Sequence, residues 1–331
     1  TQEDTYKLIE SSPGQGFERL PTPSNGDLFF DIEGDPLTEG GLEYLFGVTT
    51  YGNQGEIFRH WWSHDHVQEK QAFQEFMIFL SQHLSQYPDA NIYHYNSYET
   101  VALKRLASRY AVCEEQIDTL LRQQKFVDLY QIARHSIRTS EPGFSLKNLE
   151  IFFGRKRNDA INSADMSVVF YNRWRESGQA ELLTDIRDYN KADCESTYLL
   201  REWLLSLRPI DLTWFQNSDK ESSEPKEWEI QHDLYRTALS EVDDEYRDLA
   251  KKVSDMLEFH KRENKVEWWE TFDRQNKFTD ELIDDLNCIA DLSLTGAPVP
   301  EKRSWLYTYE FPPQEYKLRK HDAVFDVVTL Q

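Results

Sequence analysis

Residues 27–33, DLFFDIE, decide the fold. This stretch follows a region dense in proline, glycine and serine, and its apolar residues predict a β-strand. Side chains on a strand alternate between its two faces, so Asp31 and Glu33 point to the same face. Two carboxylates on one face resist joint ionisation, and the pKa of at least one should rise, unless a cation lies between them. Mg²⁺ or Mn²⁺ suits such oxygen ligands, although two solvent-facing acids on an amphipathic strand would give the same pattern.

Two more strand-like runs come next, at residues 42–51 (LEYLFGVTTY) and 56–62 (EIFRHWW). The residues between them, 52–55 (GNQG), predict a hairpin turn. Three successive strands connected in this way predict an antiparallel meander.

The pattern then becomes helical. Residues 68–86 carry apolar side chains at helical spacing, and residues 88–89 (PD) predict where that helix ends. Short strands are expected at 91–95 and 126–129. Further helices are expected at 97–110, 129–139, 145–152, 164–177 and 180–207. This order predicts an α/β fold in which a mixed sheet, an antiparallel meander followed by parallel strands, is flanked by helices.

The chain divides into five predicted segments. A short N-terminal segment and linker occupy 1–26, the α/β domain 27–208, a polar linker 209–227, a helical connector 228–295 and the start of a β-rich segment 296–331. The last segment ends inside a strand-like run, so we expect it to be truncated. The chain also lacks an initiator Met, which suggests a piece excised from a longer protein.

Composition and charge exclude several classes of protein. The 39% hydrophobic and 29% charged residues indicate a folded chain, and the formal net charge of −22 excludes a nucleic-acid-coating protein with a basic face. No run of about 18 apolar residues predicts a membrane span, and the N-terminus has no signal-peptide pattern. Cys113, Cys194 and Cys288 are isolated, so they form no disulfide framework or zinc motif, and we expect a reducing cytoplasm.

Two further patterns carry acids. In residues 185–193 (DIRDYNKAD), Tyr189 and Asp193 are four apart and share one face of a predicted helix. A phenol beside a carboxylate can orient a water that the carboxylate's metal polarises, whereas an exposed acidic helix is the simpler alternative. In residues 94–99 (HYNSYE) a strand ends and a helix begins, which places Glu99 in the first helical turn. The helix dipole favours an acid there, so Glu99 is equally explained as a helix-start residue.

Together and in this order, the D-x-E of residues 31–33, the N-x-x-E of 96–99 and the Y-x3-D of 189–193 resemble the DEDD exonucleases of the RNase H-like fold. The tyrosine resembles the DEDDy branch, since no histidine stands four or five residues before Asp193. The phrases FFDIEGDP, LEYLFGV, IYHYNSYE, FVDLY, FSLKNLE and YNKADCEST are closer still to the YprB-type RNase H-like domain.

That domain occurs in large proteins that join a RecB-like nuclease part to a superfamily I helicase. The resemblance covers residues 26–207, and HKRENKVEWWETF and YEFPPQEYKLR resemble the region between the nuclease and the helicase core of those proteins. It implies an RNase H-like exonuclease domain at 27–208, covalent linkage to RecB-like and helicase domains, a role in DNA repair and a cytoplasmic location.

The resemblance also implies a site and a reaction. The catalytic residues are expected to be Asp31, Glu33, Glu99, Tyr189 and Asp193. The four acids would bind two divalent cations, Mg²⁺ or Mn²⁺, and Tyr189 would orient the attacking water. Glu99 stands where most DEDD enzymes have Asp. The implied activity is 3′→5′ exonuclease hydrolysis of DNA or RNA by two metal ions, with single-stranded DNA or a 3′ end as the expected substrate and no membrane partner.

Other residues are assigned supporting roles. Asp128 matches a further acid just before a helix, and we expect it to lie behind the metal ligands. Lys147 and Lys191 are additional cations that could meet phosphates. The expected substrate contacts are Asn96, Arg155, Lys156 and Arg157.

The sequence also bears on three other functions. A RecB-like PD-(D/E)xK nuclease would need its E-x-K on a strand, and the candidates are residues 263–265 (ENK) and 315–317 (EYK). A helicase or ATPase is excluded for this chain because it contains no G-x4-G-K-[ST] motif. A catalytically inactive RNase H-like module that binds nucleic acid or scaffolds a larger helicase–nuclease protein stays open.

Overall fold

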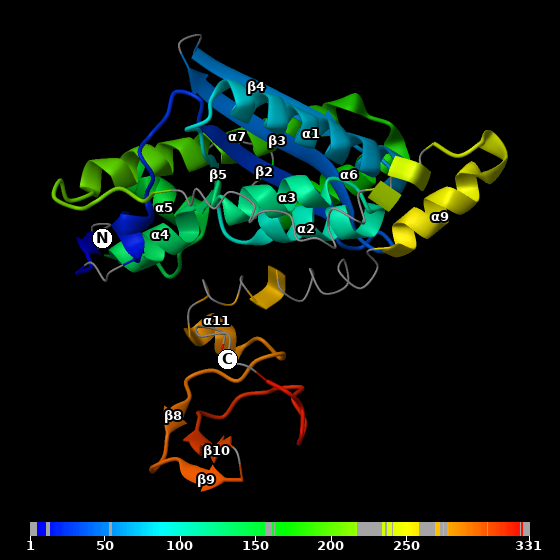
Figure 1. Ribbon diagram of the computed structural model, residues 1–331. Coiled ribbons are helices and arrows are strands. Elements are labelled where there is room, and N and C mark those ends of the chain that lie inside the picture. The colour runs from blue at the N-terminus through cyan, green and yellow to red at the C-terminus, as the bar shows by residue number, and fades with distance from the viewer. Residues whose placement is uncertain are drawn as a thin grey trace. The chain divides into compact units, whose positions relative to one another are not determined.

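The computed structural model forms two compact units, residues 1–238 and 239–331 (Figure 1). The structure describes residues 5–10, 14–52, 55–155, 161, 163–216, 234–235, 237–239, 241–257, 269–271, 274, 277, 279–302, 304–324 and 326. No helix among them is long and apolar enough to cross a membrane.

A five-stranded sheet, in the order β4-β3-β2-β5-β6, forms the centre of the first unit (Figure 1). Strands β2 (Leu28–Asp35), β3 (Leu42–Gly52) and β4 (Gly55–Trp62) are antiparallel neighbours. β5 (Ile92–His94) runs parallel to β2, and β6 (Phe126–Asp128) runs parallel to β5. The predicted mixed sheet, a meander followed by parallel strands, is confirmed.

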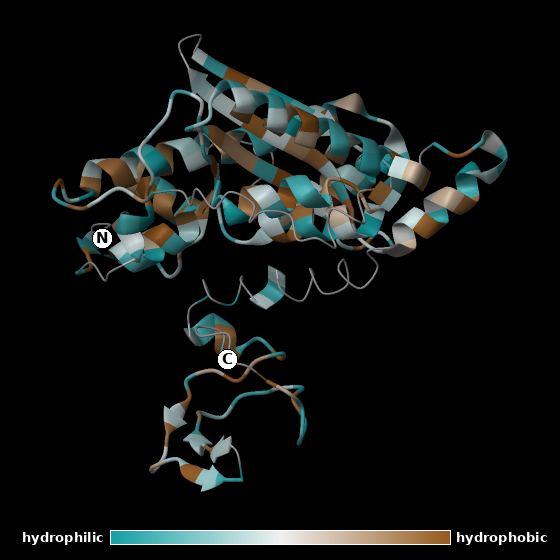
Figure 2. Cartoon of the chain, in the orientation of Figure 1, coloured by the Kyte–Doolittle hydropathy of each residue, from teal (hydrophilic) through white to brown (hydrophobic). Residues whose placement is uncertain are grey.

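Helices cover both faces of this sheet. Phe30 of β2 stacks on Phe76 of α1 (His66–Gln86) with ring centroids 4.6 Å apart, so this side chain points towards α1. The next residue, Asp31, points to the other face, where α7 (Ala180–Leu207) packs on β2 and β3. Figure 2 shows hydrophobic residues concentrated along the central strands, between these helical layers. The alternation of β2 thus directs Phe30 towards α1 and Asp31 towards α7.

The remaining helices of the first unit include the predicted ones and one further helix, between residues 110 and 126, that was not predicted. They are α2 (Tyr98–Tyr110), α3 (Glu114–Arg122), α4 (Leu129–Ser136), α5 (Leu146–Leu149), the 3-10 turn η2 (Glu150–Phe153) and α6 (Ala164–Ser177).

Two short elements differ from the sequence prediction. The helix expected at 129–139 ends at Ser136, and β7 (Ile137–Thr139) continues the chain as a strand. Its antiparallel partner is β1 (Tyr6–Leu8), inside the segment that was expected to be only a lead-in and linker. The 3-10 turn η1 (Gly16–Arg19) comes next and buries Phe17 against the core. A three-residue strand whose partner lies about 130 residues away leaves no local pattern in the sequence.

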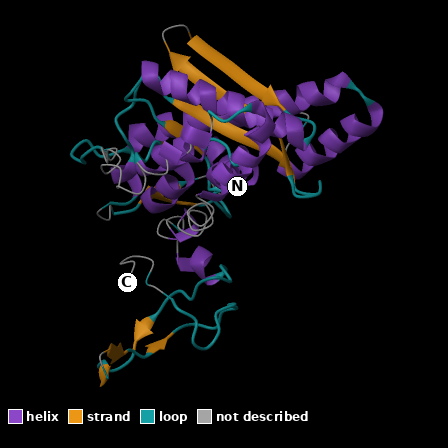
Figure 3. Cartoon of the chain, turned by 45° about the vertical axis from the view of Figure 1, so that its right-hand side comes forward, coloured by secondary structure: helices purple, strands orange, loops and turns teal. Residues whose placement is uncertain are grey.

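The second unit contains short elements, and Figure 3 draws its strands in orange. Among the described residues, its helical pieces include η3 (Asp244–Tyr246), α9 (Arg247–Leu257) and α11 (Thr279–Ile283). The strands form two antiparallel pairs, β8 (Ser293–Leu294) with β11 (Tyr309–Glu310) and β9 (Val299–Glu301) with β10 (Ser304–Leu306). Residues 284–290 are turn and loop, so the helical prediction for them was wrong. Residues 258–268 of the predicted helical connector, and residues 327–331 of the predicted β-rich segment, lie outside the described residues.

Candidate metal centre

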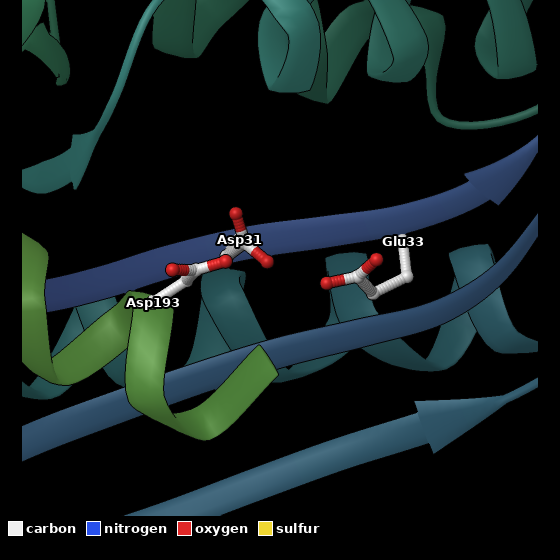
Figure 4. Close-up of side chains that lie close together, drawn as sticks. All are labelled: Asp31, Glu33 and Asp193. Carbon is white, nitrogen blue, oxygen red and sulfur yellow. The ribbon is translucent and has the colours of Figure 1, made fainter. Parts of the chain in front are cut away.

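Three carboxylates converge where α7 crosses β2. Asp31 and Glu33 lie on β2, and Asp193 reaches them from α7 (Figure 4). One oxygen from each side chain lies within 4.8 Å of the others, close enough for one ion to contact all three. The first pair shares a face because strand side chains alternate, and the crossing helix supplies the third acid.

Glu33 is the most strongly perturbed acid of this group. Its side chain is buried, and this burial raises its pKa well above the usual value. The negative charge of Asp193 raises the pKa further, whereas a hydrogen bond from Ser167 and the charge of Lys147 lower it. The rise in the pKa of Glu33 is therefore due first to burial and second to repulsion by Asp193. A bound divalent cation would stabilise the ionised form of Glu33 and so lower its pKa again. The three carboxylates offer only oxygen ligands, which fits Mg²⁺ or Mn²⁺.

Ser167 of α6 extends the contacts of Glu33. It is fully buried, and its Oγ lies 2.7 Å from the hydroxyl of Tyr44 on β3. Sequence reasoning missed this serine because its helix carries no acidic motif. The signal that could have found it is its helical spacing to Phe170, Tyr171 and Trp174, which places a polar residue on the apolar face of the helix.

Asp31 is held by Asn190 of α7, a second residue that sequence reasoning missed. The Nδ2 of Asn190 donates to Asp31 Oδ2 at 2.7 Å and to the Asp31 carbonyl oxygen at 3.2 Å. Asn190 precedes Asp193 by three residues, so a helix places both on neighbouring positions. That spacing inside the Y-N-K-A-D run was the signal that could have found it.

Tyr189 lies beside the acids in a nearly closed environment. Its side chain is 4% exposed, and the Nζ of Lys147 lies 3.3 Å from its hydroxyl and 4.9 Å from its ring centroid. Lys147 also acts electrostatically on Glu33. The site therefore combines a phenol and an ammonium group next to the three carboxylates.

Glu99 lies outside this group of three. It is buried in the first turn of α2, and its Oε2 lies 3.6 Å from Nδ1 of His94. Burial raises the pKa of Glu99, while the hydrogen bond and charge of His94 oppose that rise. Burial lowers the pKa of His94, but the Glu99 hydrogen bond and the charge of Asp128 raise it overall. The raised pKa of His94 favours its protonated form, whereas the raised pKa of Glu99 means that burial outweighs the opposing effect of His94.

Asp128 stabilises the turn that leads to Glu99. Its Oδ1 accepts hydrogen bonds from the backbone N–H of Asn96 at 2.8 Å and of Tyr130 at 2.9 Å. The second bond caps α4, and the first holds Asn96, whose φ of 71° is left-handed. One half-buried carboxylate thus joins the ends of β5 and β6.

Two of the predicted phosphate-contacting residues are paired with acids. Arg155 lies 2.7 Å from Glu195, and Lys191 lies 2.7 Å from Glu56. Lys156 and Arg157, two of the expected substrate contacts, lie outside the described residues.

The alternative E-x-K elements find no strand in the described structure. Residues 315–317 lie in a loop of the second unit. Of the other candidate, residues 263–265, the structure describes none.

Comparison with protein families matches one model, described as the RNase H superfamily, over residues 28–205, which is more than half of the chain. The match begins with β2 and ends near the end of α7, so it contains all three converging acids. Comparisons with curated proteins and with solved structures found no significant match.

Proposed function

Because the chain belongs to the RNase H superfamily, we propose that it is a metal-dependent nuclease, a DEDDy-type 3′→5′ exonuclease of the YprB type. The observation that carries this proposal is the convergence of Asp31, Glu33 and Asp193 within 4.8 Å. RNase H-like domains commonly use divalent metals, and this fold implies a nucleic acid substrate.

The three acids would hold the ions through their oxygens. When bound, two Mg²⁺ or Mn²⁺ ions would lower the pKa of the attacking water and stabilise negative charge on the leaving oxygen. Asp31 is oriented by Asn190, and Glu33 receives the hydroxyl of Ser167. These contacts fix both side chains before any ligand arrives, which is what a preorganised site requires.

Tyr189 and Lys147 would act on the reacting groups. The phenol stands one helical turn from Asp193, where it can donate a hydrogen bond to a water at the acids. Lys147 holds the phenol oxygen at 3.3 Å and supplies a positive charge for a phosphate. We propose Glu99 as a further ligand, which would have to leave His94 to reach the ions. Asn96 and Arg155 stay proposed substrate contacts.

The substrate and context rest on the resemblance. We propose single-stranded DNA or a 3′ end as substrate, although RNA uses the same phosphodiester chemistry. The net charge of −22 requires that the nucleic acid be gripped locally. Linkage to RecB-like and helicase domains and a cytoplasmic role in DNA repair belong to the same proposal.

The test is cleavage of 3′- and 5′-labelled DNA and RNA oligonucleotides, single- and double-stranded, with Mn²⁺, Mg²⁺ or EDTA. We expect metal-dependent shortening from the 3′ end. Asp193→Asn should lower the rate by more than about 100-fold, since even residues behind metal ligands are worth roughly 10- to 100-fold.

Asp188→Asn is the matched control, because Asp188 lies on the same helix with its side chain 58% exposed. It should cleave at the wild-type rate. Absence of cleavage under every metal condition would favour the catalytically inactive nucleic-acid-binding module instead.

A further inference from the structure

One side chain of α7 contacts a metal-site acid without being an acid itself. Asn190 is fully buried, and its Nδ2 bonds to both the carboxylate and the carbonyl of Asp31. Rotating the amide by 180° would place its Oδ1 against those two oxygens, so the chemistry fixes which end faces Asp31. The amide therefore acts on Asp31 as a donor.

The neighbouring strand is shaped to admit this amide. Gly47 of β3 is paired directly with Asp31, and a Cβ at position 47 would overlap Asn190 Oδ1. Cys194, one turn further along α7, donates its thiol to the Gly47 carbonyl at 3.4 Å. Helix and sheet thus approach closely at Gly47, the position opposite Asp31.

Stability does not explain the amide. Asn190 Oδ1 is buried and has no hydrogen-bond partner among the described residues. A buried polar atom without a partner destabilises a fold, and an apolar side chain of the same size would avoid that cost. The gain from the amide must therefore come from what its Nδ2 does to Asp31.

We propose that Asn190 is a positioning residue that holds the Asp31 carboxylate towards Glu33 and Asp193 for metal binding, and that Gly47 provides the space it needs. This inference rests on the proposed function, because the ion is the proposed cofactor. It assigns a role to an uncharged residue outside the predicted acids.

The test is the Kd of Mn²⁺ for the full 331-residue chain, measured by titration calorimetry, together with the melting temperature in EDTA. Asn190→Leu keeps the volume of the side chain and removes both amide atoms. We expect the Mn²⁺ Kd to rise about 10- to 100-fold while the melting temperature in EDTA stays equal or rises. A residue with a merely structural role would instead lower the melting temperature and leave the Kd unchanged.

The matched control is Asn172→Leu. Asn172 of α6 is half-buried and donates from its Nδ2 to Asp35 at 3.3 Å, so it also ties a helix to a β2 carboxylate, away from the three acids. Its Mn²⁺ Kd should equal that of the wild type.

A double-mutant cycle covers the case in which Asn190→Leu fails to fold. Gly47→Ala and Asn190→Ala should each weaken Mn²⁺ binding, and the double variant should bind no worse than Asn190→Ala alone. Additive losses, or a wild-type Kd in any folded Asn190 variant, would overturn the positioning role only. If the wild-type chain bound no Mn²⁺, both the metal site and the positioning role of Asn190 would be overturned.

Discussion

Tyr189 and Asp193 share one face of α7, but only Asp193 joins the three-carboxylate group. The phenol of Tyr189 meets Lys147 instead, and its ring is buried among apolar side chains. Removing only the hydroxyl oxygen of Tyr189 therefore tests its part in the reaction while the packing of the ring is kept.

Tyr189→Phe should lower kcat by roughly 10- to 1000-fold, because the ring keeps its packing and only the water-orienting hydroxyl is lost. Single-turnover cleavage at saturating Mn²⁺ measures this effect. Tyr171→Phe removes another phenol from the same apolar cluster and should cleave like the wild type. Equal rates for all three proteins would show that the Tyr189 hydroxyl has no part in the reaction.

Glu33 gives the metal-free protein a definite pH dependence. Its folded-state pKa is raised above the ordinary value of 4.5, so the folded state binds more protons than the unfolded state between the two pKa values. The free energy of unfolding in EDTA should therefore fall as pH rises through this interval. Urea unfolding across pH 4–8 measures it, and Glu33→Gln should give a flatter curve. An unchanged slope in the variant would contradict the assignment to Glu33.

At the scale of elements, the meander was predictable because its strands carry local patterns. Asp31 and Glu33 could be placed on one face from alternation alone, and Asp193 from its spacing to Tyr189. The contact of Asn190 with Gly47 could not be predicted, because it depends on how closely a helix approaches a sheet. The strand β7 was missed since its partner β1 is far away in the sequence. Local periodicity thus predicts which side chains share one face of a strand or helix. Packing between elements that are distant in the sequence decides which of these faces contact each other.

The turn between β5 and α2 depends on β6. Asp128→Ala removes the cap of α4 and the acceptor for Asn96, so we expect a loss of about 2 kcal/mol in the free energy of unfolding. Asp128→Asn keeps an acceptor oxygen and should lose less. Urea unfolding measures both, with the Mn²⁺ Kd measured in parallel. A weaker Mn²⁺ Kd in a stable Asp128→Asn variant would make Asp128 a metal ligand rather than a turn residue.

At the scale of the whole molecule, metal binding should appear as stability. An ion that binds only the folded state stabilises it by about 2.7 kcal/mol at a concentration of 100 Kd. Millimolar Mn²⁺ should therefore raise the melting temperature of the wild type. An Asp31→Asn, Asp193→Asn double variant should gain less, and its metal-free form should melt no lower because the repulsion is relieved.

The comparison must be made between these two proteins, since a net charge of −22 attracts divalent ions nonspecifically. Equal shifts across a Mn²⁺ titration would mean that the three acids do not form a metal site.

The N-terminal segment belongs to the core of the first unit rather than to a linker. Phe17 and Leu20 pack in one cluster with Leu200 and Leu204 of α7. The ribosome adds these partners at least 180 residues later in the chain, which at 5–20 residues per second corresponds to roughly 10–40 s. During that interval the nascent chain lacks the part of the cluster that α7 supplies to cover these two side chains. Chaperones that hold emerging polypeptides are therefore expected to engage residues 14–21 until α7 has been synthesised.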